Sequence, residues 1–205
     1  DYFGMDPVIY QNPSLTYDEK DLANWSVKKI DLGTDSDGVK TTRIEVTTPE
    51  GTMVEMRGDN PITGWITQHM IKTKEDFELW NKYFPIPTGV DWAPVINAKN
   101  RIGDTGIVRG GYYDFGQGSP WQSFAFMFGT EEIIMAAIDE PDWLHYVMKT
   151  LLNKKMQVVE LGGKIEMDLI ETGGGAGSST VISPSIHEEF CLPYDQVQHK
   201  ELRDR

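Results

Sequence analysis

The residues with the clearest chemical potential follow a short apolar stretch late in the chain. Met167 to Glu171 (MDLIE) has the composition of a buried strand, and four glycines follow within five positions, at 173–175 and 177. A carboxylate can serve as a general base, and glycines let a ligand approach the backbone closely. In barrels and open α/β sheets, the edge where the core strands end builds the active site. We therefore expect a site lined by Glu171, Thr172, Gly173, Gly174 and Gly175.

The alternative for the same segment is a flexible connecting loop, because glycine clusters are also common in loops. The segment is not a phosphate-binding P-loop, since no Gly-Lys-Ser/Thr follows, and it does not match GxGxxG.

A second group of candidates follows the stretch Gly106 to Tyr113 (GIVRGGYY), which is typical of a buried strand running into a loop. Tyr113 and Asp114 end this strand, and Trp121 follows the loop. An aromatic and acidic rim at such a place is suited to a planar or cationic ligand. Ordinary packing at a strand end is the alternative.

His187 and Cys191 lie four residues apart, so a helix would place them on one face, where they could bind zinc. No third ligand is evident nearby, so a core thiol beside a polar histidine is the favoured interpretation. No metal ligand is assigned within the 205 residues.

Several elements must position these residues. Alternation across 42–47 and 52–56, with a Pro49-Glu50-Gly51 turn, predicts an antiparallel hairpin. Thr73 is a suitable cap for a helix to Phe84, and residues 1–40 look polar and irregular. Further helices are expected over 91–100, 131–138 and 141–162, and a last one from Ser183, kinked at Pro193. Strand, helices, strand and helix in residues 105–205 favour a parallel sheet covered by helices.

Composition narrows the function classes. The hydrophobic content of 39% supports a folded core, and a net charge of −13 argues against a nucleic-acid partner. No apolar run of membrane-spanning length occurs, so no membrane span is expected. A single cysteine and the lack of an apolar signal core at the start predict a cytoplasmic protein.

Four stretches together resemble the uroporphyrinogen decarboxylase-like superfamily, and its corrinoid (methylcobamide) methyltransferase branch most of all. Residues 171–194 (ETGGGAGSSTVISPSIHEEFCLPY) are similar to its strand, substrate loop and following helix. Pro120-Trp121 lies where the family has its "PW" segment, and residues 128–149 resemble its next helix pair. The TPEGT turn at 48–52 and the helix KTKEDFELW resemble the methyltransferase-like members. The resemblance covers roughly the last 165 residues, and the order of the motifs makes it specific.

The resemblance implies a (β/α)₈ TIM barrel, here partial because eight strands need about 250 residues. Residues 1–100 would form an N-terminal extension with the β-hairpin and helices, and 101–205 the first part of the barrel. We expect the chain to belong to a longer protein.

The implied activity is transfer of a methyl group from a methylated corrinoid (cobalamin-type) protein to a thiol, such as coenzyme M, or to tetrahydrofolate, in one-carbon metabolism. Glu171 would be the catalytic residue, and Thr172 matches a substrate-contacting position of the decarboxylase. Zinc-dependent members hold the metal with a His-x-Cys pair and a later cysteine, which would lie beyond Arg205.

Two alternatives remain. Uroporphyrinogen decarboxylation, a step of porphyrin biosynthesis, is disfavoured because the "RQAGRY" signature and the aspartate of the "F.DI" strand are not found, and Phe126 stands where the pocket tyrosine would be. The other alternative is a non-catalytic protein that binds a corrinoid or another tetrapyrrole.

Overall fold

The computed structural model describes residues 6–111 and 118–205 and shows a mixed α/β protein. The chain forms two compact units. Unit 1 contains the described residues within 1–17, 86–123 and 136–205, and unit 2 contains 18–85 and 124–135. The expected division into an N-terminal extension (1–100) and the first part of a barrel (101–205) is a different division from these two units, and it stays a prediction.

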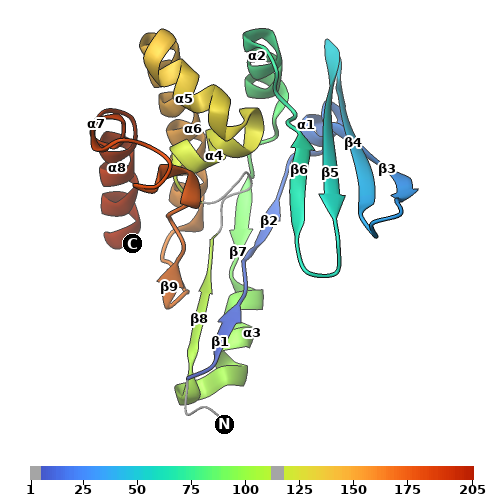
Figure 1. Ribbon diagram of the computed structural model, residues 1–205. Coiled ribbons are helices and arrows are strands. Elements are labelled where there is room, and N and C mark those ends of the chain that lie inside the picture. Colours follow the sequence, from blue (N-terminus) through green and yellow to red (C-terminus); the bar gives the residue numbers. More distant parts are fainter. Residues whose placement is uncertain (1–5, 112–117) are drawn as a thin grey trace. The chain divides into compact units, whose positions relative to one another are not determined.

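Unit 2 is built on a four-stranded antiparallel sheet in the order β3-β4-β5-β6 (Figure 1). Its elements are α1 Glu19–Ala23, β3 Ser26–Thr34, β4 Lys40–Thr48, β5 Gly51–Asp59, β6 Gly64–Gln68 and α2 Lys74–Tyr83. The expected hairpin is confirmed as β4 and β5, with Thr48 opposite Gly51 across the turn. The helix expected from Thr73 is α2, and Thr73 closes a capping box with Asp76. Phe77 and Trp80 on its inner face are buried.

Unit 1 holds the segments that were expected to carry chemistry. Its strands are β1 Val8–Tyr10, β2 Ser14–Thr16, β7 Gly89–Asp91, β8 Ile107–Gly110 and β9 Leu169–Ile170. Its helices are α3 Ala93–Ile102, α6 Pro141–Gly162, α7 Pro184–Ile186 and α8 Leu192–Arg203, with 3₁₀ turns at Gly103–Thr105 and Gly175–Gly177. Two more helices, α4 Pro120–Phe128 and α5 Thr130–Asp139, have residues in both units.

The parallel sheet predicted from the element order is confirmed. β1, β8 and β9 lie side by side in that order, all parallel, with Arg109 opposite Leu169 (Figure 1). β2 and β7 form a separate antiparallel pair. Among the described residues, neither sheet of unit 1 closes into a barrel.

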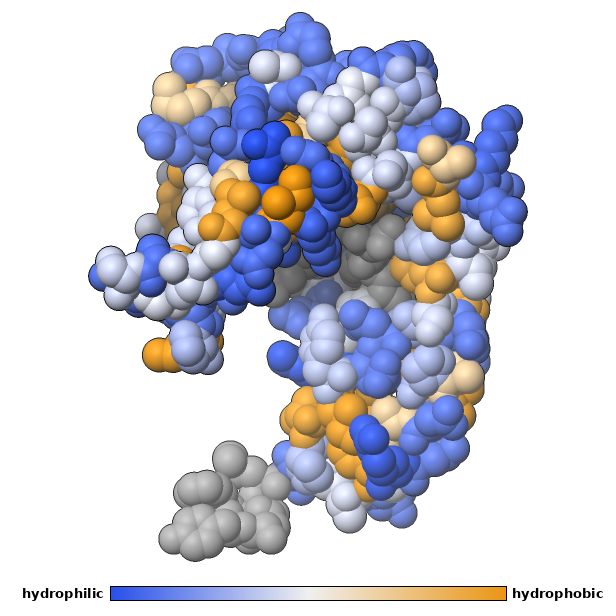
Figure 2. All heavy atoms as spheres, turned by 90° about the vertical axis from the view of Figure 1, so that its right-hand side faces the viewer, coloured by the Kyte–Doolittle hydropathy of each residue, from blue (hydrophilic) through white to orange (hydrophobic). Residues whose placement is uncertain are grey.

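Among the residues that the structure describes, one face of the parallel sheet is covered and the other is not. Val108 on β8 packs into a core with α3 and α6, which contribute Val95, Ala98, Ile102, Val158 and Val159. On the opposite face, four large apolar side chains are 40–54% exposed: Val8, Tyr10, Ile107 and Leu169. Figure 2 shows apolar side chains gathered low in the molecule, at the level of β1 and α3.

The expectation that residues 1–40 are irregular was wrong, chiefly because of β3. This nine-residue strand pairs with β4, but nearly all of its residues are exposed. An edge strand that buries neither face carries no alternation of apolar and polar residues, so the sequence pattern does not predict it.

The last helix departs from α geometry just before Pro193, and the kink expected at this proline stays a prediction. Residues His187–Cys191 form a π-helical turn between α7 and α8. Pro193 has no N–H to donate to the carbonyl of Glu189, four residues earlier, which interrupts the regular ladder.

Candidate functional site

The glycine-rich segment follows directly on the parallel ladder. The N–H of Glu171 donates to the carbonyl of Gly110 at 2.8 Å, which extends the pairing of β8 and β9 by one step. Glu171 therefore lies where the carboxyl ends of two neighbouring parallel strands meet. This is the edge at which α/β proteins bind their ligands.

The segment is anchored, which a flexible connecting loop would not be. The indole N–H of Trp121 donates to the carbonyl of Ala176 at 2.9 Å. The side-chain oxygen of Gln122 accepts from the N–H of Ala176, also at 2.9 Å. Both backbone groups of Ala176 are thus held by the first turn of α4, and all three residues are buried.

Ser119 explains why α4 begins where it does. Its hydroxyl accepts from the N–H of Gln122 at 3.1 Å, and Pro120 stands at the first helical position. A serine cap followed by proline is a strong start signal. The helix start therefore fixes the two side chains that anchor Ala176.

The glycines fall into two kinds. A Cβ on Gly174 would collide with the side chain of Gln122, and a Cβ on Gly118 would collide with the backbone of Thr172. Gly173 and Gly175 face open space. Gly174 and Gly118 are thus required for close packing, whereas Gly173 and Gly175 leave the backbone accessible to a ligand.

Thr172 meets a histidine that the sequence motifs did not single out. Its hydroxyl oxygen lies 2.9 Å from Nε2 of His199 on α8. The neighbouring Gln198 donates from Nε2 to the carbonyl of Gly118 at 2.7 Å. Asp195 lies one turn earlier on α8, and burial raises its pKa while His199 and His187 act to lower it. In the sequence, the helical spacing of Asp195 and His199 was the signal that could have pointed to His199 as a site residue.

The predicted site residues are brought together only in part. Glu171, Thr172 and Gly173–Gly175 form one continuous segment. Trp121 is 1% exposed, so its place here is behind the loop as an anchor. Tyr113 and Asp114 lie outside the described residues.

Cys191 and His187 form no metal site. The thiol of Cys191 is buried, and burial, with a smaller effect of Asp195, raises its pKa to about 12. A thiol with this pKa stays protonated at neutral pH, which disfavours nucleophilic attack. In the part of the chain that the structure describes, no three His, Cys, Asp or Glu residues gather to hold a metal. These residues therefore do not fit a zinc ion.

No protein-family model, curated protein or solved structure matches the chain. Within residues 6–111 and 118–205, no helix is both long and apolar enough to cross a membrane.

Proposed function

We propose that the chain is part of a methyltransferase that moves a methyl group from a methylated corrinoid protein to a thiol or to tetrahydrofolate. The observation that carries the proposal is the position of Glu171, at the ends of two parallel strands beside an anchored glycine-rich segment. The ordered motifs resembling the uroporphyrinogen decarboxylase-like superfamily supply the reaction class.

We further propose that β8 and β9 belong to a partial (β/α)₈ barrel, with β1 of the N-terminal extension paired beside β8. Parallel sheets are nearly always covered on both faces. Here α3 and α6 cover one face, while Val8, Tyr10, Ile107 and Leu169 expose the other. In a barrel, the uncovered face would be the packed interior.

In this proposal Glu171 acts on the methyl acceptor. A carboxylate at a strand end could orient a thiol or take its proton as the sulfur attacks the methyl group, while the carbon–cobalt bond of the co-substrate breaks and its electron pair stays with the cobalt. Thr172 would hold the acceptor through its hydroxyl, and the open backbone at Gly173 and Gly175 would let it approach. The corrinoid enters as a co-substrate, and no step depends on zinc.

The test is methyl transfer from methylcobalamin to coenzyme M or to tetrahydrofolate, followed by the change in cobalamin absorbance. Glu171→Gln keeps the size of the side chain and removes the base, so turnover should fall on the order of 10²-fold or more. The matched control is Glu166→Gln, which removes a carboxylate paired with Lys164 on the approach to β9.

Equal rates in wild type and Glu171→Gln would reject the catalytic role of Glu171. Cobalamin binding without demethylation would favour the non-catalytic binding protein. Loss of carboxylates from uroporphyrinogen would favour the decarboxylase.

A further inference from the structure

One turn of α8 holds the two segments that follow the parallel strands β8 and β9. Gln198 donates from Nε2 to the carbonyl of Gly118 at 2.7 Å. The next residue, His199, has its Nε2 atom 2.9 Å from the hydroxyl oxygen of Thr172. Gly118 and Thr172 also touch each other, because a Cβ on Gly118 would lie 2.2 Å from the Cα of Thr172. These contacts, all within unit 1, fix Thr172 next to Glu171.

The two side chains of α8 respond differently to pH. Gln198 is buried, and its amide donates at any pH. His199 is exposed, and an imidazole ordinarily gains or loses its proton between pH 5 and 8. The hydrogen bond between His199 and Thr172 is therefore the contact whose direction can reverse.

The direction of this hydrogen bond decides what Thr172 offers to a ligand. A threonine hydroxyl has one proton to donate and two lone pairs that accept. When Nε2 of His199 carries no proton, it accepts the proton of Thr172, and only lone pairs remain for the ligand. An imidazolium has protons on both nitrogens, so Nε2 donates to Thr172 and the hydroxyl proton is free for the ligand.

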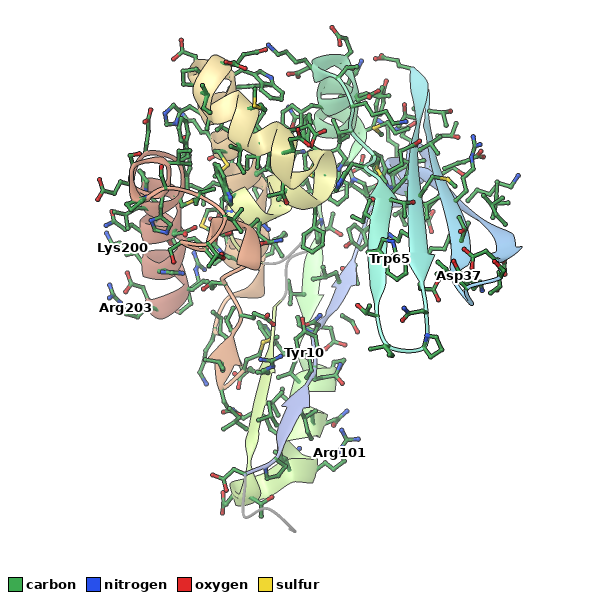
Figure 3. All side chains as sticks on the ribbon, in the orientation of Figure 1. Tyr10, Asp37, Trp65, Arg101, Lys200 and Arg203 are labelled. Carbon is green, nitrogen blue, oxygen red and sulfur yellow. The ribbon has the colours of Figure 1, made fainter. Side chains whose placement is uncertain are left out.

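Asp195 is the acidic group that acts on His199. It lies one turn earlier on α8; burial raises the pKa of its carboxyl, while His199 and then His187 lower it. Asp168 near this site is paired with Lys99. Lysine and arginine side chains stay charged up to pH 8. The other charged side chains around His199 are Lys200 and Arg203, which project from α8 (Figure 3), and Arg205.

We propose that His199 is a positioning residue, which in its protonated form turns the hydroxyl proton of Thr172 toward an anionic group of the methyl acceptor. The inference rests on the proposed function and narrows it, because the anionic group is then a thiolate. Glu171 takes the proton of the thiol, and the O–H of Thr172 donates to the negative sulfur as it attacks the methyl group.

The first measurement needs no methyl transfer. With isotope-labelled histidine in the protein, Thr172→Val should change the Nε2 chemical shift of His199 between pH 6 and 8. Thr172→Ser should restore it, because serine keeps the hydroxyl. His187 is the internal control, since it also acts on Asp195 but lies about 18 Å away along the helix axis. An unchanged His199 signal in Thr172→Val, or equal changes in both histidines, would overturn the inference.

The second measurement is kcat/KM for methyl transfer from methylcobalamin to coenzyme M at pH 6 and pH 8. Each variant is divided by wild type, so that ionisation of the thiol cancels. His199→Leu removes the donor and should lower kcat/KM on the order of ten-fold at pH 6, and much less at pH 8. His199→Gln keeps a donor that does not titrate, so its ratio to wild type should rise with pH.

His187→Leu is the matched control and should leave the rate unchanged at both pH values. Equal ratios for His199→Leu at pH 6 and pH 8 would overturn the positioning role and leave the proposed function standing. Transfer to tetrahydrofolate but not to coenzyme M would overturn the anionic acceptor. Absence of any methyl transfer by the wild type would reject the proposed function, and the histidine shifts would then decide alone whether His199 sets the direction of the Thr172 hydroxyl.

Discussion

The side-chain oxygen of Gln122 accepts a 2.9 Å hydrogen bond from the backbone N–H of Ala176. Gln122 and Ala176 are both buried, so water does not reach this N–H, and the Gln122 side chain is its hydrogen-bond acceptor. The glycine-rich segment is therefore placed by α4, and its position depends on a side chain far away in the sequence.

Gln122→Met should destabilise the protein by about 1–3 kcal/mol, because the N–H of Ala176 would stay buried without an acceptor. Urea denaturation followed by circular dichroism measures this. Gln157→Met, at an exposed position of α6, should change stability by less than about 0.5 kcal/mol. A similar effect of both variants would contradict the anchoring role.

Gly174→Ala should destabilise by about 1–3 kcal/mol, because the new Cβ collides with Gln122. Gly173→Ala has open space around its Cβ and should be nearly neutral. Melting temperatures of the two variants compare adjacent glycines directly. If both variants melt alike, steric fit does not explain the requirement for glycine at 174.

Asp168→Asn should lower the free energy of unfolding at neutral pH but not at low pH. Lys99, and then the N–H of Val108, hold the pKa of Asp168 below its usual value. The stability from this carboxylate is therefore complete above about pH 4, the unfolded value, and is lost as the pH falls through the lower folded value.

The pair is partly exposed, so the expected loss at pH 7 is about 0.5–1 kcal/mol. Urea midpoints between pH 2 and 7 should converge at the acid end. Lys99→Met should give a similar loss at pH 7, and no added effect in the double variant. Parallel curves for wild type and Asp168→Asn would exclude this linkage.

Lys155 predicts a rise of stability with pH as well, but in a higher pH range than Asp168. This lysine of α6 is fully buried, and burial lowers its pKa to about 7. Between this value and the unfolded value, the unfolded chain binds more protons, so stability should rise with pH. The rise is at most about 1.4 kcal/mol per pH unit.

Urea denaturation at pH 7.0 and 8.0 tests this, below the ordinary thiol pKa of about 8.5, at which ionisation of Cys191 in the unfolded chain would oppose the rise. Lys155→Met should remove the increase between the two pH values. A wild-type protein without any gain between the two pH values would mean that Lys155 stays charged in the fold.

The sequence predicted the elements that have strong local signals. The hairpin at 42–56, the capped helix α2, and α6 from Pro141 to the glycines at 162–163 all combine clear periodicity with recognisable ends. β3 and α4 were missed for opposite reasons. β3 is exposed on both faces, while α4 is mostly buried, so neither shows the periodicity of a half-buried element.

The candidate site was predictable as a segment and not as a set of contacts. Glycine spacing after an apolar strand indicated 171–177, because that signal is local. The contact between Thr172 and His199, and the anchoring of Ala176 by Trp121 and Gln122, join residues far apart in the sequence. No local pattern encodes such pairs, because they exist only after the sheet and helices have packed.

The pairing of Val8 with Ile107 has a consequence for how this protein folds during its synthesis on the ribosome. β3 to β6 join successive neighbours, so their contact order is low and they can fold as soon as they emerge. β1 can pair only after β8, about 100 residues later in the chain, has been synthesised. Synthesis proceeds at roughly 5–20 residues per second. During that interval Ile9, which packs against the buried core of β8, α3 and α6 in the folded protein, stays exposed to water.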